Sequence, residues 1–211
     1  MSTSQSTPFT QPAETWNARF SKDGYVFGTE PNEWLKRHAH IWKPNSRILC
    51  VADGEGRNSV WLALQGHQVE AFDISEVGVA KAKRLAQEKQ VAVEYAVARC
   101  EDYAWKSEQF DGVVAIFVQF ADPKLRALLF EKMVSSLKAG GTLLLVGYTP
   151  KQLEYRTGGP SVVSHLYTPD LLRDSFCNMT IKVLDEYELE LTEGDGHKGR
   201  SAVIGLVATR A

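Results

Sequence analysis

Two glycines and two carboxylates are spaced as in a binding site for a nucleotide-like cofactor. Gly54 and Gly56 follow a short apolar stretch and precede a run with helical spacing. Such glycines let the backbone turn sharply beside a ligand, and the next helix offers free N–H groups. Asp53 precedes the turn, and Asp73, at the end of the next apolar stretch, is placed to accept hydrogen bonds from ribose hydroxyls. The pattern predicts an adenosine-containing cofactor, with a glycine turn that binds no ligand as the alternative.

Two details separate the candidate cofactors. A dinucleotide-binding fingerprint has a third glycine where this chain has Ser59. Asp53 also places a carboxylate directly before the turn, where it would repel a pyrophosphate and attract an ammonium group. The residues therefore favour S-adenosylmethionine, which carries an amine and no phosphate. An NAD-dependent dehydrogenase is the alternative, which a titration with NAD would test.

The stretch from Tyr148 to Tyr167 is rich in glycine and proline, and long loops at strand ends often carry specificity. His165 is a candidate general base here, as is Tyr148, although a structural histidine is the commoner case. Arg156 together with Arg57 is a candidate anion site for a substrate. The loop therefore supplies the candidate catalytic residues and part of the candidate substrate site.

Strands and helices are expected to alternate and to bring these residues together. Continuous apolar strands between amphipathic helices predict a doubly wound, Rossmann-like α/β fold. Its sheet would have seven mostly parallel strands and a C-terminal antiparallel hairpin with a glycine-rich turn over residues 193–200. Ligands of such sheets lie outside the carboxyl ends of the strands. Strands are expected over residues 47–52, 68–74, 91–98, 111–117, 142–147, 181–191 and 202–209, and helices over 31–41, 57–65, 75–90 and 169–176 and from Pro123.

Composition excludes several classes of function. The formal net charge of −2 shows no basic excess, which disfavours nucleic acid as a partner. The three scattered cysteines lack metal-ligand spacing and predict neither a disulfide framework nor a metal site, in keeping with a cytoplasmic protein. No apolar run is long enough to span a membrane. A small-molecule partner is expected, in a monomer or homodimer.

From about Gly24 to its C-terminus the sequence resembles the class I S-adenosylmethionine-dependent methyltransferases. Four stretches carry the resemblance: 51–63 (VADGEGRNSVWLA), 68–75 (QVEAFDIS), 110–123 (FDGVVAIFVQFADP) and 137–147 (LKAGGTLLLVG). Within that class the first stretch is most similar to the tellurite-resistance methyltransferases and their thiopurine methyltransferase relatives. The resemblance implies methyl transfer from S-adenosylmethionine.

The resemblance also implies roles for residues around the glycine turn. Asp53 would lie near the methionine amine of the cofactor, directly or through water. Gly54 and Gly56 would pass beneath the cofactor, Asp73 would bind the ribose hydroxyls, and Ile74 would lie against adenine.

The chain departs from the family pattern at the adenine contact. Where the family often has an acid that accepts from the adenine amino group, this chain has Arg99. The neighbouring residues Cys100, Glu101 and Asp102 are the replacements expected at this contact, by side chain or by backbone carbonyl.

Two further groups complete the implied site. Phe117 and Gln119 would face the methionine portion and the transferred methyl group, Gln119 being a substrate candidate. The segment 23–32, which includes Tyr25 and Gly28, would lie across the cofactor as a lid, because aromatic faces attract a sulfonium cation. Aromatic residues that merely anchor the next helix are the alternative. Arg19 is a candidate partner for the methionine carboxylate.

The expected domain organisation is a disordered tail over residues 1–15 and a single domain over 16–211. The domain comprises a lid and helix over 16–46 and the core over 47–211. Because no motif for a strong base is evident, the acceptor is expected to be a soft nucleophile, such as a selenium or tellurium oxyanion or a thiol. A non-catalytic sensor or partner subunit that binds S-adenosylmethionine is the alternative, suggested by Arg99.

Overall fold

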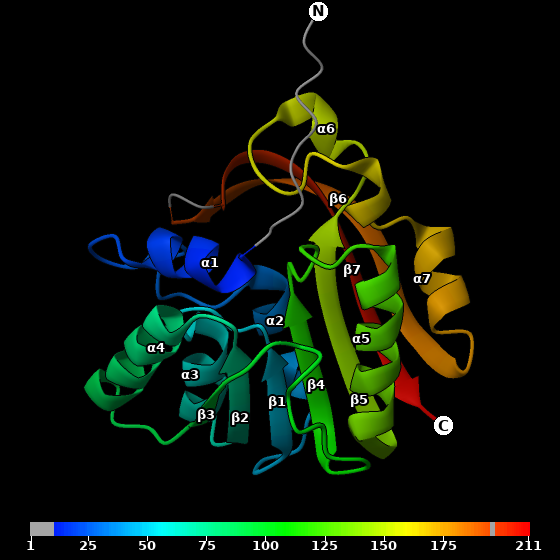
Figure 1. Cartoon of the computed structure of the whole chain (residues 1–211). Coiled ribbons are helices and arrows are strands. Elements are labelled where there is room, and N and C mark those ends of the chain that lie inside the picture. The colour runs from blue at the N-terminus through cyan, green and yellow to red at the C-terminus, as the bar shows by residue number, and fades with distance from the viewer. Residues whose placement is uncertain (1–10, 195–196) are drawn as a thin grey trace, which may run out of the picture.

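The computed structural model describes residues 11–194 and 197–211 of the chain. Seven strands form one sheet in the order β3-β2-β1-β4-β5-β7-β6 (Figure 1). The strands are β1 (Arg47–Val51), β2 (Gln68–Asp73), β3 (Glu94–Val97), β4 (Phe110–Ile116), β5 (Leu137–Tyr148), β6 (Met179–Glu193) and β7 (His197–Arg210). The helices are α1 (Pro12–Phe20), α2 (Glu33–His38), α3 (Arg57–Leu64), α4 (Glu76–Glu88), α5 (Pro123–Ser136), α6 (Gln152–Tyr155) and α7 (Pro169–Ser175), with 3₁₀ turns η1 (Ala39–Ile41) and η2 (Val163–His165).

The direction of the strands confirms the expected fold class. β1 pairs in parallel with β2 and β4, β2 with β3, and β4 with β5. β7 is antiparallel to both β5 and β6 and closes the sheet as a hairpin. The strand order reverses beside β1 and β4, and in open α/β sheets this is the place where ligands bind.

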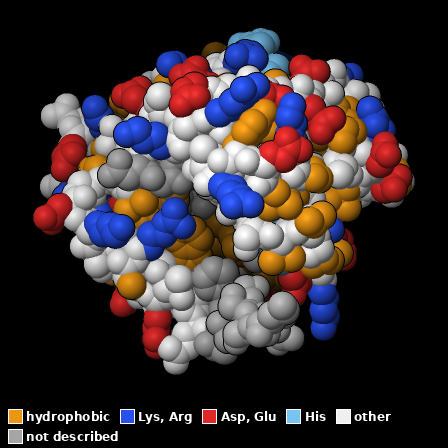
Figure 2. All heavy atoms as spheres, turned by 90° about the horizontal axis from the view of Figure 1, so that it is seen from above, with side chains coloured by type: hydrophobic (Ala, Val, Ile, Leu, Met, Phe, Trp, Pro, Cys, Tyr) orange, Lys and Arg blue, Asp and Glu red, His pale blue; other side chains and the backbone are white. Residues whose placement is uncertain are grey.

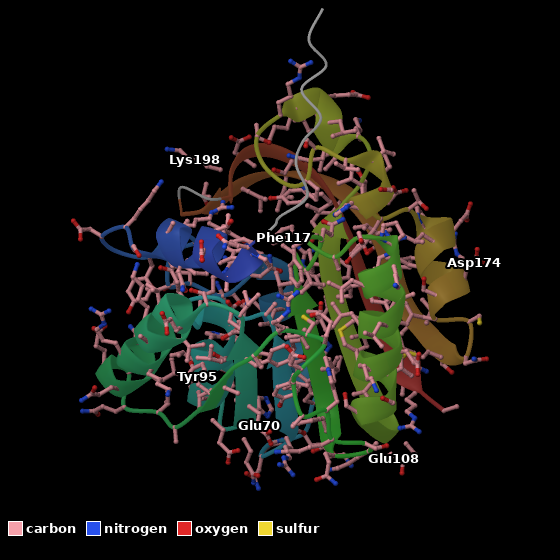
Figure 3. All side chains as sticks on the ribbon, in the orientation of Figure 1. Glu70, Tyr95, Glu108, Phe117, Asp174 and Lys198 are labelled. Atoms are coloured by element: carbon pink, nitrogen blue, oxygen red, sulfur yellow. The ribbon has the colours of Figure 1, made fainter. Side chains whose placement is uncertain are left out.

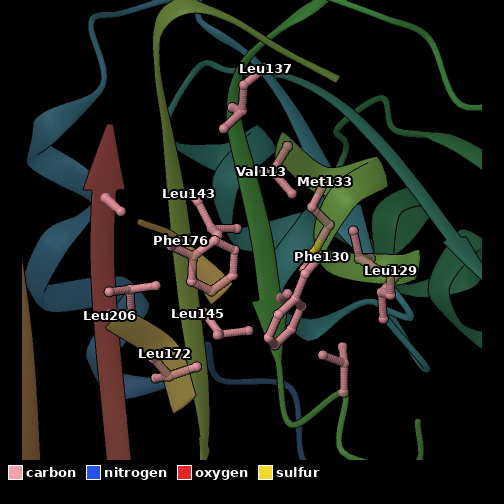
Figure 4. Close-up of a cluster of buried hydrophobic side chains, with 14 of the residues drawn as sticks. Val113, Leu129, Phe130, Met133, Leu137, Leu143, Leu145, Leu172, Phe176 and Leu206 are labelled. Carbon is pink, nitrogen blue, oxygen red and sulfur yellow. The ribbon is translucent and has the colours of Figure 1, made fainter. Parts of the chain in front are cut away.

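Successive residues of the central strands pack on opposite faces of the sheet. In β5, Leu143 and Leu145 belong to the cluster under α5 and α7, whereas Leu144 and Val146 belong to the cluster under α2 and α3. Figure 4 shows the first cluster, where Phe130 of α5 lies among the leucines of the sheet. This alternation on two buried faces explains why the strands are continuously apolar.

Polar side chains cap the starts of three helices, at Ser75, Asp122 and Thr168. The Ser75 hydroxyl accepts a hydrogen bond from Gly78 N at 3.0 Å, and the Asp122 carboxylate accepts one from Leu125 N at 2.8 Å. Thr168 accepts one from Leu171 N. These caps satisfy backbone donors that the first helical turn leaves without a partner.

The element boundaries differ from the expected ones, most of all in three places. Residues 12–15 belong to α1, which begins at Pro12, rather than to a disordered tail, and residues 1–10 of that expected tail lie outside the described residues. β5 begins at Leu137 rather than at residue 142 and runs through Gly140 and Gly141. β6 extends to Glu193 and β7 begins at His197 rather than at residue 202, so the two strands pair with each other beyond the end of β5. In the described part of the chain, no helix is long and apolar enough to cross a membrane.

Candidate functional site

Two residues in a strained backbone conformation mark the carboxyl ends of the central strands. Ala52 directly follows β1 with φ of 50°, and Phe117 directly follows β4 with φ of 57°. A non-glycine residue in this left-handed region costs about 1–3 kcal/mol, and such strain gathers at functional sites. Phe117 lies at the upper edge of the sheet in Figure 3, opposite the edge that carries Glu70 and Glu108. The upper edge is therefore where the sequence-predicted site residues should meet.

Asp73, at the end of β2, is bound to the backbone on both sides. Its Oδ2 accepts from Gly54 N at 2.9 Å and its Oδ1 from Ser75 N at 2.8 Å. Burial raises the pKa of Asp73, and these backbone donors oppose the rise. A carboxylate has about four lone-pair positions, so Asp73 fixes the glycine turn and keeps acceptor capacity for hydroxyl groups.

Asp53 lies beside Asp73 at the end of β1. The pKa of Asp53 is raised to about 7, because burial and the charge of Asp73 raise it by more than the hydrogen bond from Ser59 lowers it. Ser59 Oγ donates to Asp53 Oδ2 at 2.5 Å. A second buried carboxylate nearby and a pKa near neutrality are the electrostatic conditions under which a bound cation would be stabilised.

The two glycines of the turn face different neighbours. A Cβ atom at position 54 would lie 3.2 Å from Phe20 Cζ of α1. At position 56, where φ is 92°, it would lie 2.7 Å from Ala82 Cβ of α4. Gly54 therefore lets α1 approach the turn, and Gly56 lets α4 approach it from the other side.

Residues 12–32 form a segment that we name the N-terminal cover; it begins with α1 and lies over the strand ends (Figure 1). Asn17 Oδ1 accepts from Ser75 Oγ at 2.6 Å, which docks α1 on the start of α4. The Arg19 guanidinium lies 5.1 Å from the centroid of the Trp16 ring and 5.0 Å from that of Phe27. Among the described residues Arg19 forms no ion pair with a carboxylate, so its donors remain available to an anionic group.

Glu55, the residue between the two glycines, ties the N-terminal cover to the turn. Its buried carboxylate accepts from Val26 N at 2.7 Å and from Lys81 Nζ at 2.9 Å. Lys81 Nζ also donates to the carbonyl oxygens of Lys22 and Gly24, at 2.7 and 2.6 Å. The same turn thus carries the candidate ligand contacts and holds the segment that covers them.

The tip of the β6–β7 hairpin closes on the N-terminal cover from the far end of the sheet. Glu193 Oε2 pairs with Arg57 Nη2 at 2.6 Å, with both side chains less than 10 % exposed, and Glu193 Oε1 accepts from Asn32 Nδ2 at 2.9 Å. A Cβ atom on Gly194 would lie 2.4 Å from the carbonyl oxygen of Val26. Backbone therefore meets backbone where the hairpin touches the cover.

Residues 149–167, which we name the upper loop, are held by Gln119. Gln119 Nε2 donates to the carbonyl oxygens of Tyr148 and His165 at 2.9 and 3.0 Å, and Gln119 Oε1 accepts from Tyr148 N at 2.6 Å. His165 Nδ1 lies 2.9 Å from the carbonyl oxygen of Gln119. The Phe117 and Tyr148 rings stack at 4.6 Å, and burial raises the pKa of Tyr148. The amide of Gln119 and one nitrogen of His165 are thus used within the protein.

The cover and two helices form the surroundings of Tyr25, which is expected to lie over the cofactor. Tyr25 packs with Val60 and Leu85 between α3 and α4. It lines a separate cavity of about 690 Å³ between the N-terminal cover and α4. Gly28 meets the hairpin tip, 3.6 Å separating Gly194 N from a Cβ atom built on Gly28.

The residues expected around adenine divide into a buried and an exposed group. Cys100 is buried near Asp73, its carbonyl oxygen accepts from Trp105 Nε1, and burial raises its thiol pKa to about 12. Arg99 is about half exposed and pairs with Glu101 at 3.3 Å. Arg99 is therefore directed to an acid at the surface. Ile74, half-buried, follows Asp73 directly.

The two arginines expected to form an anion site differ in burial and in their contacts. Arg57 is buried and engaged by Glu193, whereas Arg156 is exposed at the end of α6, with φ of 56°. The two guanidinium groups share no partner among the described residues. His197 is paired by its backbone within the hairpin.

Sequence reasoning missed the side chains that hold the cover. Glu55 and Lys81 are buried in an ion pair, Phe20 packs on Gly54, and Asn58 Oδ1 accepts from Asn32 N at 3.0 Å. The one available signal was Glu55, a charged residue inside a glycine turn that is otherwise close to backbone. Its partner at position 81 lies on an amphipathic helix, where a lysine normally faces solvent.

The face above the strand ends is hollowed. Figure 2 shows this face, where hydrophobic side chains line a hollow that basic side chains border on one side. A concave, largely apolar site with a few convergent polar groups is typical of small-molecule binding. The arrangement can hold a cationic ligand next to Asp53 and hydroxyl groups next to Asp73.

Comparison with known proteins finds similar sequences in the same region. Residues 48–141 match the family model described as a methyltransferase domain. A ubiquinone biosynthesis O-methyltransferase of Xanthomonas campestris is 31% identical over 131 residues, 61% of this chain and 54% of that protein. A tRNA 5-carboxymethoxyuridine methyltransferase of Escherichia coli is 26% identical over 183 residues, 74% of this chain and 67% of that protein. The chain thus spans about half the length of the first relative.

Solved structures share the whole fold. A structure from work on the conversion of a disulfide bond into a thioacetal group during echinomycin biosynthesis superposes with a TM-score of 0.77 at 16% identity, covering 94% of this chain and 92% of the other. TehB of Haemophilus influenzae gives 0.70 at 18% identity, covering 94% and 67%. Magnesium protoporphyrin IX methyltransferase of Synechocystis, solved with bound S-adenosylhomocysteine, gives 0.65 at 18%, covering 96% of each. The seven-stranded sheet is therefore the fold of S-adenosylmethionine-dependent methyltransferases.

Proposed function

We propose that this chain is an S-adenosylmethionine-dependent methyltransferase that acts on a small-molecule acceptor. The observation that carries the proposal is that Asp53 and Asp73 lie next to each other beside the Gly54 turn, at the ends of two adjacent parallel strands. The match of residues 48–141 to a methyltransferase domain supports the same reading. When bound, S-adenosylmethionine supplies a methyl group on a positively charged sulfur.

The residues around the turn fit that cofactor. Asp53 offers a buried carboxylate to an ammonium group, which would restore the ionised form at neutral pH. Asp73 offers its remaining lone pairs to ribose hydroxyls. Arg19, held between two aromatic rings and unpaired with any described carboxylate, offers a fork of N–H donors to the methionine carboxylate. The cover excludes water from these contacts.

The acceptor proposed is a soft nucleophile, such as a thiol or a selenium or tellurium oxyanion. Such a nucleophile needs alignment and desolvation more than a strong base. The two candidate bases support this choice: His165 already contacts the Gln119 carbonyl, and the buried Tyr148 has a raised pKa. Oxygen acceptors and tRNA, named for the two relatives above, are the alternatives that the experiment includes.

A non-catalytic sensor that binds the cofactor is the second function considered. It rested on Arg99 at the adenine position, but the Arg99 side chain lies at the surface beside Glu101. Arg99 therefore gives this alternative no structural support.

The test is the release of S-adenosylhomocysteine from S-adenosylmethionine with a panel of acceptors: thiols, selenite, tellurite, phenols, small carboxylates and tRNA. Asp73→Asn should remove turnover, because one oxygen that binds backbone or ribose is lost. Asp174→Asn, an exposed acid on α7, is the matched control. Turnover on one acceptor class that is lost in Asp73→Asn and kept in Asp174→Asn supports the proposal. Absence of cofactor binding by the unaltered protein contradicts it.

A further inference from the structure

A row of three polar side chains runs from the candidate site into the space between α3 and β3. Ser59 of α3 donates to Asp53 Oδ2 at 2.5 Å, and the Tyr95 hydroxyl of β3 lies 2.9 Å from Ser59 Oγ. Ser59 is fully buried, and Tyr95 lies beside β2 in Figure 3. None of the roles derived above uses Ser59 or Tyr95 for binding a ligand.

The direction of the hydrogen bonds in this row follows from the number of protons. Ser59 Oγ has two acceptors within reach, Asp53 Oδ2 at 2.5 Å and the carbonyl oxygen of Gly56 at 3.2 Å. An ionised Asp53 only accepts and is the nearer and charged acceptor, so the single proton of Ser59 is directed to it. The Tyr95 hydroxyl must then donate to Ser59. Burial raises the pKa of Tyr95, which keeps that donor protonated at every pH near neutrality. The row is therefore directed from Tyr95 through Ser59 to Asp53.

Gly56 is what makes room for this row. A Cβ atom at position 56 would lie 3.0 Å from Tyr95 Oη as well as 2.7 Å from Ala82 Cβ. Ser59 itself occupies the position where a dinucleotide-binding turn has glycine, which has no hydroxyl to offer. The turn is thus built to bring a hydroxyl, rather than a bare backbone, against Asp53.

The other groups that face Asp53 compete with one another. Asp73, from β2, disfavours its charge, and Arg57, from the start of α3, favours it. Cys50, from β1, has a pKa raised by burial and is neutral. Of the groups that favour the charged form of Asp53, the Ser59 hydroxyl has the largest effect.

We propose that Ser59 and Tyr95 are positioning residues that favour the ionised form of Asp53 and orient its carboxylate toward the ammonium group of the cofactor. The inference rests on the proposed function, since it assigns Asp53 to that ammonium group. It assigns the two hydroxyls a role in the pH dependence of cofactor binding rather than in methyl transfer itself.

The test measures the affinity of S-adenosylhomocysteine, which keeps the ammonium group, by calorimetry from pH 5.5 to 8.5. The Asp53 pKa of the ligand-free protein is measured separately by carboxyl carbon NMR. Ser59→Ala should raise the Asp53 pKa and the pH midpoint of the binding affinity by roughly 1 pH unit each. It should weaken binding about tenfold at pH 6, because a hydrogen bond to a charged group is lost. Tyr95→Phe should act in the same direction with a smaller shift. Ser136→Ala is the control, since that fully buried hydroxyl donates only to Met133 O, on α5.

The outcomes separate this inference from the proposed function. Upward shifts of the Asp53 pKa and of the binding midpoint in Ser59→Ala and Tyr95→Phe, with none in Ser136→Ala, support the positioning role. Unchanged midpoints, or weakening that is equal at every pH, overturn it. Should Ser59→Ala not fold, Tyr95→Phe carries the test alone, because it removes one hydroxyl and little volume. Failure of the unaltered protein to bind S-adenosylhomocysteine contradicts the proposed function instead.

Discussion

The N-terminal cover and the upper loop both close the edge of the sheet where the strands end, but different contacts hold them. The cover is fastened by buried charges: Glu55 with Lys81, and Glu193 with Arg57. The upper loop is fastened by the neutral amide of Gln119, and at its outer side by an exposed cluster around Glu188.

This difference suggests a division of labour. Removing one member of a buried ion pair leaves the other charge uncompensated, so such a segment is either fully docked or detached. Hydrogen bonds to a neutral amide and exposed ion pairs are weaker than buried ion pairs, so a segment that they hold detaches more gradually. We therefore expect the cover to behave as a two-state closure over the cofactor and the upper loop to adjust more readily around an acceptor.

The largest effect is expected for Asp53→Asn in the ligand-free protein. The native pKa of about 7 exceeds the ordinary value of 3.8, so the carboxyl favours the folded state below pH 4 and that contribution is lost as pH rises through 7. Below pH 4 the variant and the parent should have the same free energy of unfolding. Above pH 7 it should be more stable, by at most about 4 kcal/mol. Urea unfolding at pH 5 and pH 8 measures this, and equal pH dependence in both proteins would contradict it.

Glu55→Gln should detach the cover. The change leaves Lys81 without its carboxylate, and breaking a buried pair costs about 3 kcal/mol in the free energy of unfolding. Limited proteolysis should then cut near Lys22, and S-adenosylhomocysteine should bind more weakly. Glu131→Gln, on the exposed side of α5, is the control. A protein as stable and as protease-resistant as the control would show that this pair does not hold the cover.

Gln119→Met should loosen the upper loop while leaving the cover in place. Three hydrogen bonds are lost and the Tyr148 N–H becomes unsatisfied, which should cost about 2 kcal/mol. The loss should be the same at low and high salt, because no charge is involved. Thermal unfolding in about 0.05 and about 1 M NaCl, roughly twenty-fold apart in ionic strength, distinguishes this from an electrostatic effect. Gln87→Met, exposed on α4, is the reference, and a marked dependence on salt would contradict the neutral character of this contact.

The smallest effect is expected for Glu188→Gln. Glu188 is exposed, and Lys151, Tyr155 and Arg200 hold its pKa at about 2 by hydrogen bonding to its carboxylate. Solvent screens such a cluster, so unfolding should change little, and any change should vanish in high salt or below pH 2. A loss as large as that of Gln119→Met would show that the exposed cluster, and not the amide, anchors the upper loop.

The strands and most helices could be predicted from the sequence because their signals are local. Leu143 to Val146 alternate between two buried faces and therefore appear as a continuous apolar run. Ser75 and Asp122 begin helices through hydrogen bonds to residues three positions away. These features are set by periodicity and capping, which one stretch of sequence contains.

The contacts that close the site could not be predicted in this way. Glu55 meets Val26 and Lys81, and Arg57 meets Glu193, so each pair joins residues far apart in the chain. The sequence predicts an anion site from Arg57 and Arg156, whereas in the structure Arg57 pairs with Glu193. The aromatic ring of Tyr25 predicts a place over the cofactor but not the contacts that the ring makes with residues of α3 and α4. A charge or ring can be assigned a type of chemistry from sequence, but its neighbours depend on the topology.

The contact between the hairpin tip and the cover has a consequence for how the molecule is made. Asn32 and Glu193, which hydrogen bond to each other, are 161 residues apart. During synthesis the cover leaves the ribosome long before the strand that secures it, and contacts between distant residues form late in folding. We expect the Val26 N–H and the Asn32 side chain to become protected only after the sheet is complete, which pulsed hydrogen exchange during refolding would measure. Protection of Val26 before that of β7 would contradict this order. In the growing chain the site then stays open until the β6–β7 hairpin forms and contacts the cover.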